Sequence, residues 1–80
     1  MKKILLAINH KETEETIKTM VRDDFLCVGT ATYKEAVLPL LKDTQPDVLV
    51  LRDTLQGNTP ILQMIEEIRI EIPDTRIVFI

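Results

Sequence analysis

Short apolar runs alternate along this chain with longer segments in which apolar residues recur every three or four positions. The runs predict strands at Ile4–Ile8, Phe25–Val28, Val48–Leu51 and Arg76–Ile80. Runs of this length, with little internal polarity, are typical of strands buried in a parallel sheet. The pattern therefore predicts four strands separated by three helices.

The first two helical segments carry the spacing of a capping box. Asn9 precedes Glu12 by three positions, and Thr32 precedes Glu35 in the same way. In that motif the first side chain accepts from the backbone of the third helical residue, and the acidic side chain reaches back. Pro39 falls inside the second segment and predicts a kink there or a helix that begins again at that residue.

The third helical segment has the clearest boundaries. Thr59 and Pro60 provide a capping hydroxyl followed by proline at the first helical position, and Pro73 follows the last periodic residue. Isoleucines then recur at helical spacing at positions 61, 65, 68 and 72. Strands that alternate with helices through short connections imply right-handed crossovers and a parallel sheet. We therefore expect one α/β domain over residues 1–80.

Composition narrows the classes of function. The 80 residues have a net charge of -3 and a pI near 5.0, so no basic surface is available for nucleic acid. Apolar residues make up 45% and aromatic residues 4%, which predicts an aliphatic core. The single cysteine excludes an internal disulfide or a metal cluster. No apolar run approaches the roughly 20 residues of a membrane span, and no signal peptide is evident. We expect a cytoplasmic domain without a cofactor.

The stretch from Pro46 to Gly57 reads P-D-V-L-V-L-R-D-T-L-Q-G. It resembles the third strand and phosphorylation loop of receiver domains in two-component response regulators, where an aspartate ends the apolar run. Arg52 stands at the position of that phosphate acceptor, and Gln56 replaces the usual loop proline. The resemblance implies a flavodoxin-like parallel sheet with strand order 2-1-3-4 and helices on both faces. It also implies that the fifth strand of a complete receiver is missing.

The resemblance further implies a degenerate phosphorylation pocket made of Ile8, Asn9, Arg52 and Asp53. Receiver domains end their first strand with two acidic residues that hold magnesium, and Ile8 and Asn9 occupy those positions here. One alkyl group and one amide are poor magnesium ligands. Arg52 either mimics the charge of the metal or pairs with Asp53. We expect no metal site and no aspartyl phosphorylation of the ordinary kind.

Three functions remain open. The leading hypothesis is a non-catalytic signalling module that binds an unidentified protein partner. The first alternative is a receiver that accepts phosphate on Asp53, and the second is a sensor of small anions at His10, Arg52 and Thr54. Atypical receivers of this kind also resemble the N-terminal modules of partition-type ATPases of the ParA/MinD class in pilus assembly or conjugation, which the opening residues 1–6 fit.

The fourth predicted strand suggests self-association. Its residues Ile77, Val78, Phe79 and Ile80 are apolar, and the order of strands places it at an edge of the sheet. Uncovered apolar edges pair readily with other strands. We therefore expect a homodimer formed around this strand, either by edge pairing or by packing of the open sheet faces.

Overall fold

The computed structural model describes all residues from 1 to 80 and contains one parallel sheet with strand order β2-β1-β3-β4. Its strands are β1 (Lys2–Ala7), β2 (Phe25–Ala31), β3 (Val48–Leu51) and β4 (Arg76–Phe79). The predicted parallel sheet and its strand order are confirmed. β2 is longer than predicted, because Gly29 and Thr30 continue to pair with Leu5 and Leu6 although the apolar pattern has ended.

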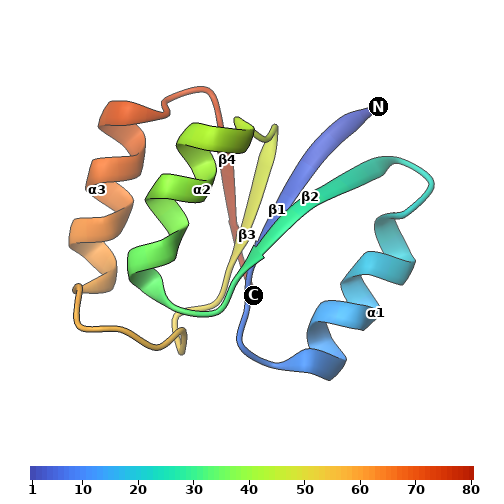
Figure 1. The fold of residues 1–80 in the computed structure, drawn as a ribbon, viewed down its shortest axis with the longest axis horizontal. Helices are drawn as coiled ribbons and strands as arrows, with labels where there is room; N and C mark the ends of the chain where they lie inside the picture. Colours follow the sequence, from blue (N-terminus) through green and yellow to red (C-terminus); the bar gives the residue numbers. More distant parts are fainter.

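The helices are α1 (Lys11–Val21), α2 (Val37–Thr44) and α3 (Ile61–Glu71), and a 3-10 turn η1 (Lys34–Ala36) precedes α2. α2 and α3 lie together on one face of the sheet, and α1 lies alone on the other (Figure 1). The prediction of helices on both faces is therefore confirmed. No helix combines the length and the apolar character that a crossing of a bilayer requires.

Side chains of β1 point alternately into two apolar clusters, one on each face of the sheet. The larger cluster lies under α2 and α3 and contains Leu5, Ala7, Ala31, Val37, Leu41, Leu49, Leu51, Leu55, Met64 and Ile68. The smaller cluster lies on the α1 side and contains Ile4, Leu6, Ile8 and Val50. No residue of α1 is fully buried. The α1 side is therefore the thinner half of the core.

The capping box predicted at Thr32 and Glu35 is wrong. Residues 34–36 form the 3-10 turn, and α2 begins only at Val37, without a side-chain cap. Pro39 consequently lies in the first turn of α2, where its missing N–H leaves no intrahelical bond unmade. The helix therefore begins at Val37, two residues before the predicted restart at Pro39.

The cap predicted at Thr59 is also wrong. Pro60 occupies the N-cap position of α3, with φ of -59°, and no side chain caps the helix. The hydroxyl of Thr59 instead donates to the carboxylate of Glu35 at 2.7 Å. The Thr59 hydroxyl, which the local spacing assigned to the cap of α3, is therefore bonded to a carboxylate 24 positions away in the sequence.

Burial within α3 predicts a sharp contrast between two of its isoleucines. Ile68 is fully buried in the larger cluster, whereas Ile70 is 80% exposed. We expect Ile68→Ala to lower the free energy of unfolding by about 2–5 kcal/mol, because it removes methylenes and leaves a cavity. Ile70→Ala is the matched control and should change it by less than about 0.5 kcal/mol. Urea unfolding followed by circular dichroism measures both, and equal losses would contradict the burial.

Candidate functional site

The carboxyl ends of β1 and β3 meet at one edge of the sheet. The backbone N–H of Arg52 donates to the carbonyl of Ala7 at 3.2 Å, so the residues that follow the two strands are neighbours. Ile8 is buried with 1% of its surface exposed, and Asn9 is exposed. The sheet therefore places Ile8, Asn9 and Arg52 at the same edge, where open α/β sheets bind their ligands.

The Arg52 side chain reaches across to the start of α1. Its Nη1 donates to Oγ1 of Thr13 at 3.3 Å, and that oxygen lies 2.8 Å from Nδ1 of His10. His10 Nδ1 also accepts from the backbone N–H of Thr13 at 3.3 Å. A ring nitrogen that accepts carries no hydrogen, so the hydroxyl hydrogen of Thr13 points to His10. The resulting chain runs from Arg52 through Thr13 to His10.

His10, and not Asn9, caps α1. His10 has extended backbone angles, φ of -119° and ψ of 110°, and its side chain accepts from the third helical residue. The capping box predicted at Asn9 and Glu12 is therefore wrong, and the cap lies one residue later. An imidazole nitrogen takes the place of the usual hydroxyl or carboxylate oxygen of an N-cap.

Asp53 and Thr54 are exposed on the turn that follows β3. The structure contains two ion pairs, Lys18–Glu14 and Lys42–Glu71. Arg52 therefore does not pair with Asp53, which was one of its two expected roles. Its guanidinium is directed to Thr13 instead.

A second polar group joins α1 to the end of β2. The Thr30 hydroxyl donates to Oε1 of Glu14 at 2.7 Å, and Nζ of Lys18 lies 3.1 Å from the same oxygen. The hydrogen bond from Thr30, followed by that from Lys18, lowers the pKa of Glu14 below its ordinary value. The Glu14 carboxylate in turn raises the pKa of Lys18. The spacing of four residues between Glu14 and Lys18 is the sequence signal that could have indicated this ion pair.

A third polar group holds the loop between β3 and α3. Oε2 of Glu35 accepts from the backbone N–H of Thr59 at 3.0 Å and from its hydroxyl at 2.7 Å. These bonds lower the pKa of Glu35. Gly57 has φ of +135°, and a Cβ at this position would lie 2.6 Å from Oε1 of Glu35. The loop therefore requires glycine where it passes the carboxylate.

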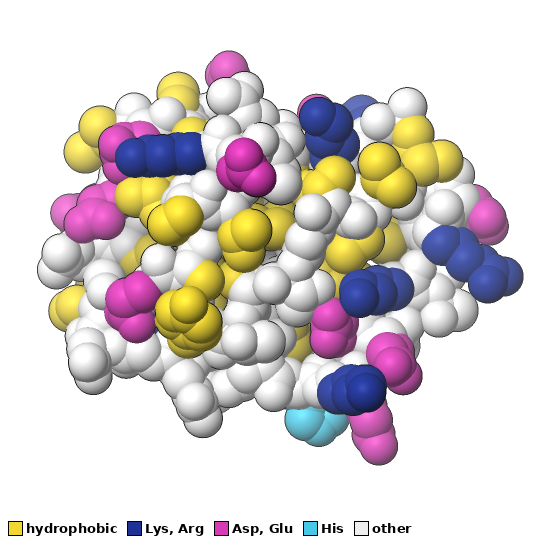
Figure 2. Space-filling model, viewed as in Figure 1, with side chains coloured by type: hydrophobic (Ala, Val, Ile, Leu, Met, Phe, Trp, Pro, Cys, Tyr) yellow, Lys and Arg dark blue, Asp and Glu magenta, His cyan; other side chains and the backbone are white.

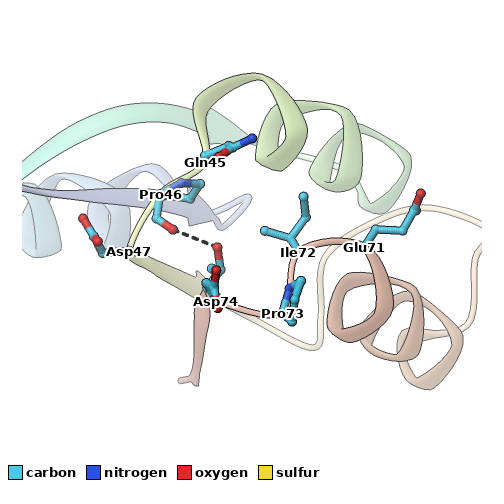
Figure 3. Close-up of a pocket in the computed structure, with 8 residues that line it drawn as sticks. Gln45, Pro46, Asp47, Glu71, Ile72, Pro73 and Asp74 are labelled. Carbon is cyan, nitrogen blue, oxygen red and sulfur yellow. Dashed lines mark hydrogen bonds between the residues drawn. The ribbon is translucent and has the colours of Figure 1, made fainter.

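None of the hollows of the surface is lined by His10, Arg52 or Thr54. One hollow of about 190 Å³ lies at the opposite edge of the sheet (Figure 3). It is lined by Gln45, Pro46, Asp47, Glu71, Ile72, Pro73, Asp74 and Thr75. The hydroxyl of Thr75 donates to the carbonyl of Pro46 at 2.7 Å, so two of the lining residues are bonded to each other.

Charged side chains show no concentration of one sign on the visible face of the molecule. Figure 2 shows Lys and Arg side chains interspersed with Asp and Glu side chains. Nowhere do three His, Cys, Asp or Glu side chains come together in a way that could hold a metal ion. The polar contacts among Arg52, Thr13 and His10 are thus the main chemical feature of this edge of the sheet.

Solved receiver domains have the same fold. The chain superimposes on the signal receiver domain of a modulated diguanylate cyclase from Desulfovibrio desulfuricans with a TM-score of 0.85 and 15% identity, covering 100% of this chain and 64% of that one. It matches RcsB from Salmonella enterica serovar Typhimurium, solved bound to promoter rprA, with a TM-score of 0.87 and 17% identity. This match covers 99% of this chain and 41% of RcsB. It matches a variant of the anti-anti-sigma factor PhyR from Bartonella quintana with a TM-score of 0.82 and 14% identity, over 98% of this chain and 32% of that one.

These comparisons establish a receiver-like fold for this chain. It spans about one-third to two-thirds of the length of the solved chains that it matches. No protein-family model matches the sequence. The predicted resemblance to receiver domains is thus confirmed at the level of the fold, while the link to partition-type ATPases stays a prediction.

The cap at His10 gives a test with a matched neighbour. We expect His10→Ala to lower the free energy of unfolding by about 0.5–2 kcal/mol, because it leaves the N–H of Thr13 without its acceptor. Asn9→Ala removes an exposed side chain that makes no hydrogen bond and should have little effect. Thermal unfolding of the two variants beside the wild type measures the difference, and a larger loss for Asn9→Ala would show that the cap is misassigned.

The Glu35 contacts predict a dependence on acid. Because the folded pKa of Glu35 is lowered, its contribution to stability is present above its ordinary value of 4.5 and is lost as the pH falls through the lower folded value. Glu35→Gln should therefore lower the unfolding midpoint at neutral pH, and the gap to the wild type should close below pH 4.5. Glu12→Gln, on an exposed position of α1, is the control. A difference in unfolding midpoint between Glu35→Gln and the wild type that persists in acid would show that the ionised carboxylate is not its cause.

Proposed function

We propose that this chain is a receiver-like signalling module that acts by binding another protein and does not accept phosphate on an aspartate. The observation that carries the proposal is the position of Arg52. It follows β3 directly, where the receiver resemblance places the phosphate acceptor, and its guanidinium donates to Thr13 of α1. A permanent cation therefore occupies the site of a nucleophilic carboxylate.

The first strand supports the same proposal. Phosphoryl transfer to a receiver aspartate uses a magnesium ion, and the resemblance places the acidic pair that holds it at Ile8 and Asn9. Ile8 is buried in the smaller apolar cluster, and Asn9 offers a single exposed amide. Magnesium is normally bound through one or two carboxylates. The edge formed by these residues offers it none.

Arg52 also suggests how the module works without a phosphate. Its bond to Thr13 joins the end of β3 to the first turn of α1, and Thr13 in turn contacts His10. A fixed positive charge thus connects elements that a metal and a phosphoryl group would otherwise connect. In this proposal the module holds one binding conformation constantly, and its partner reads that conformation.

A protein partner fits the surface better than nucleic acid. The net charge is -3, so the chain offers little for the release of counterions from a phosphate backbone. PhyR, whose fold this chain shares, is an anti-anti-sigma factor. Within this proposal the module works in the cytoplasm without a cofactor, and attachment to a ParA/MinD-type ATPase is one setting that its resemblance allows.

Treatment with acetyl phosphate and magnesium tests the proposal directly. We expect the intact mass of the wild-type protein to remain unchanged, while a phosphorylatable receiver domain treated in parallel gains one phosphoryl group. Calorimetry with millimolar magnesium alone should show no saturable heat.

Two results would favour the alternatives. A stable phosphoryl adduct that disappears in Asp53→Asn would establish Asp53 as an acceptor. Stabilisation of the wild type by phosphorylated metabolites in a thermal-shift screen, lost in Arg52→Gln, would support a sensor of small anions.

A further inference from the structure

His10 caps α1 with both its backbone and its ring. Its carbonyl accepts from the backbone N–H of Glu14 at 3.0 Å, and its Nδ1 accepts from the backbone N–H of Thr13 at 3.3 Å. A backbone N–H can only donate, so Nδ1 must present a lone pair, and the hydrogen of the neutral ring lies on Nε2. The side-chain cap of α1 therefore exists only while the imidazole is neutral.

Protonation of the imidazole turns this acceptor into a donor. Both nitrogens of an imidazolium carry hydrogen, so Nδ1 would face the backbone N–H of Thr13 donor to donor. The new hydrogen can still bond Oγ1 of Thr13 at 2.8 Å, but that oxygen already accepts from Nη1 of Arg52 at 3.3 Å. Two cations would then share one neutral oxygen, while the backbone N–H would have no acceptor.

The sheet brings no carboxylate into an ion pair with His10. Neither ion pair of the structure includes this residue. β2 and β3 carry no charged residue, and the charged residues of β1, Lys2 and Lys3, lie at the other end of that strand. On the turn after β3 the charged groups are Arg52 and the exposed Asp53.

The first turn of α1 adds Lys11, Glu12 and Glu14. Glu14 is already paired with Lys18, and the other two are exposed and of opposite sign. Exposed charges attract or repel only weakly because water and salt screen them, so the loss of a helix cap outweighs them. The positive end of the helix dipole also disfavours a cation at the N-cap. The folded edge therefore favours neutral His10.

We propose that His10 is a pH-sensitive switch, whose protonation opens the first turn of α1 and separates it from Arg52. The inference rests on the proposed function, because the Arg52 edge holds the conformation that the partner reads, and it adds a regulation of that edge. Of the two bonds to the Thr13 oxygen, the one from Arg52 is the longer and is the one that breaks. Histidine ordinarily gains its proton between about pH 8 and pH 5, so mild acidification is the signal.

A second anchor confines the opening to the first turn. The Thr30 hydroxyl donates to Oε1 of Glu14 at 2.7 Å and so ties α1 to the end of β2. The hydrogen bond from Thr30, followed by that from Lys18, holds the pKa of Glu14 below its ordinary value of 4.5. This carboxylate therefore stays ionised while histidine titrates. α1 remains on the sheet as its first turn and Arg52 separate.

The variant His10→Asn gives the first test, because asparagine is a strong N-cap that does not titrate. We expect the thermal midpoint of the wild type to fall relative to that of His10→Asn as the pH is lowered from about 7.5 to about 5.5. The expected fall is about 4–8 °C, which is the effect of one lost cap in a domain of this size. Carboxylates titrate in both proteins, so the difference isolates residue 10.

The variant Arg52→Gln tests the second cation. In this variant the fall with acid should be smaller than in the wild type, because the imidazolium no longer meets a guanidinium at the Thr13 oxygen. A fall as large as that of the wild type would show that Arg52 takes no part in the switch.

Nuclear magnetic resonance of the wild type tests the same step without a variant. Near neutral pH the ring hydrogen of His10 should lie on Nε2. The amide resonance of Thr13 should then move with the ring resonances of His10 as the pH falls, while the amides of the last turn of α1 keep their positions. This measurement does not require either variant to fold.

Parallel midpoints of the wild type and His10→Asn across this pH range would overturn the inference. A ring hydrogen on Nδ1 at neutral pH would also overturn it, as would a Thr13 amide that does not follow His10. Any of these results in a protein that takes up no phosphoryl group removes this inference alone and leaves the proposed function standing. Phosphorylation on Asp53 in a protein whose Thr13 amide follows His10 does the reverse.

Discussion

The burial of β1 on both of its faces is the constraint on which the remaining structure depends. Leu5, Leu6 and Ala7 have no exposed surface, and this strand pairs with β2 on one side and β3 on the other. A strand in this position must be covered by helices above and below, so each crossover places a helix on one face. The same pairing brings the ends of β1 and β3 together and so creates the edge at which Arg52 lies.

The sequence predicted the elements well because their signals are local. Each apolar run that predicts a strand lies within about five residues, and the isoleucine spacing that predicts α3 lies within a single helix. The polar contacts were missed because they are not local. Glu35 bonds to Thr59 across 24 positions and Glu14 to Thr30 across 16, so spacing within one helix cannot show where either carboxylate points.

The Arg52 edge lies between these two cases. The resemblance to receiver domains identified Ile8, Asn9 and Arg52 by their positions in the sequence. The strand order then implies that these residues lie at one edge, as they do in the structure. The contact between Arg52 and Thr13 could not be foreseen, because it depends on the angle at which α1 leaves the sheet. The cap at His10 lies one residue later than the spacing indicated, and the residue whose N–H it accepts is Thr13, the same residue that bonds to Arg52.

The central place of β1 has a consequence for how the chain acquires its structure. The strand nearest the amino terminus is made first, yet its backbone at Lys3 bonds to the side chain of Asp47 across 44 positions. No two neighbouring strands are joined by a hairpin, so no part of the sheet can form from residues close in sequence. Contacts between distant residues slow folding, because the loop must close before the pairing is gained. During synthesis β1 therefore cannot complete its pairing on both sides until β3 has left the ribosome.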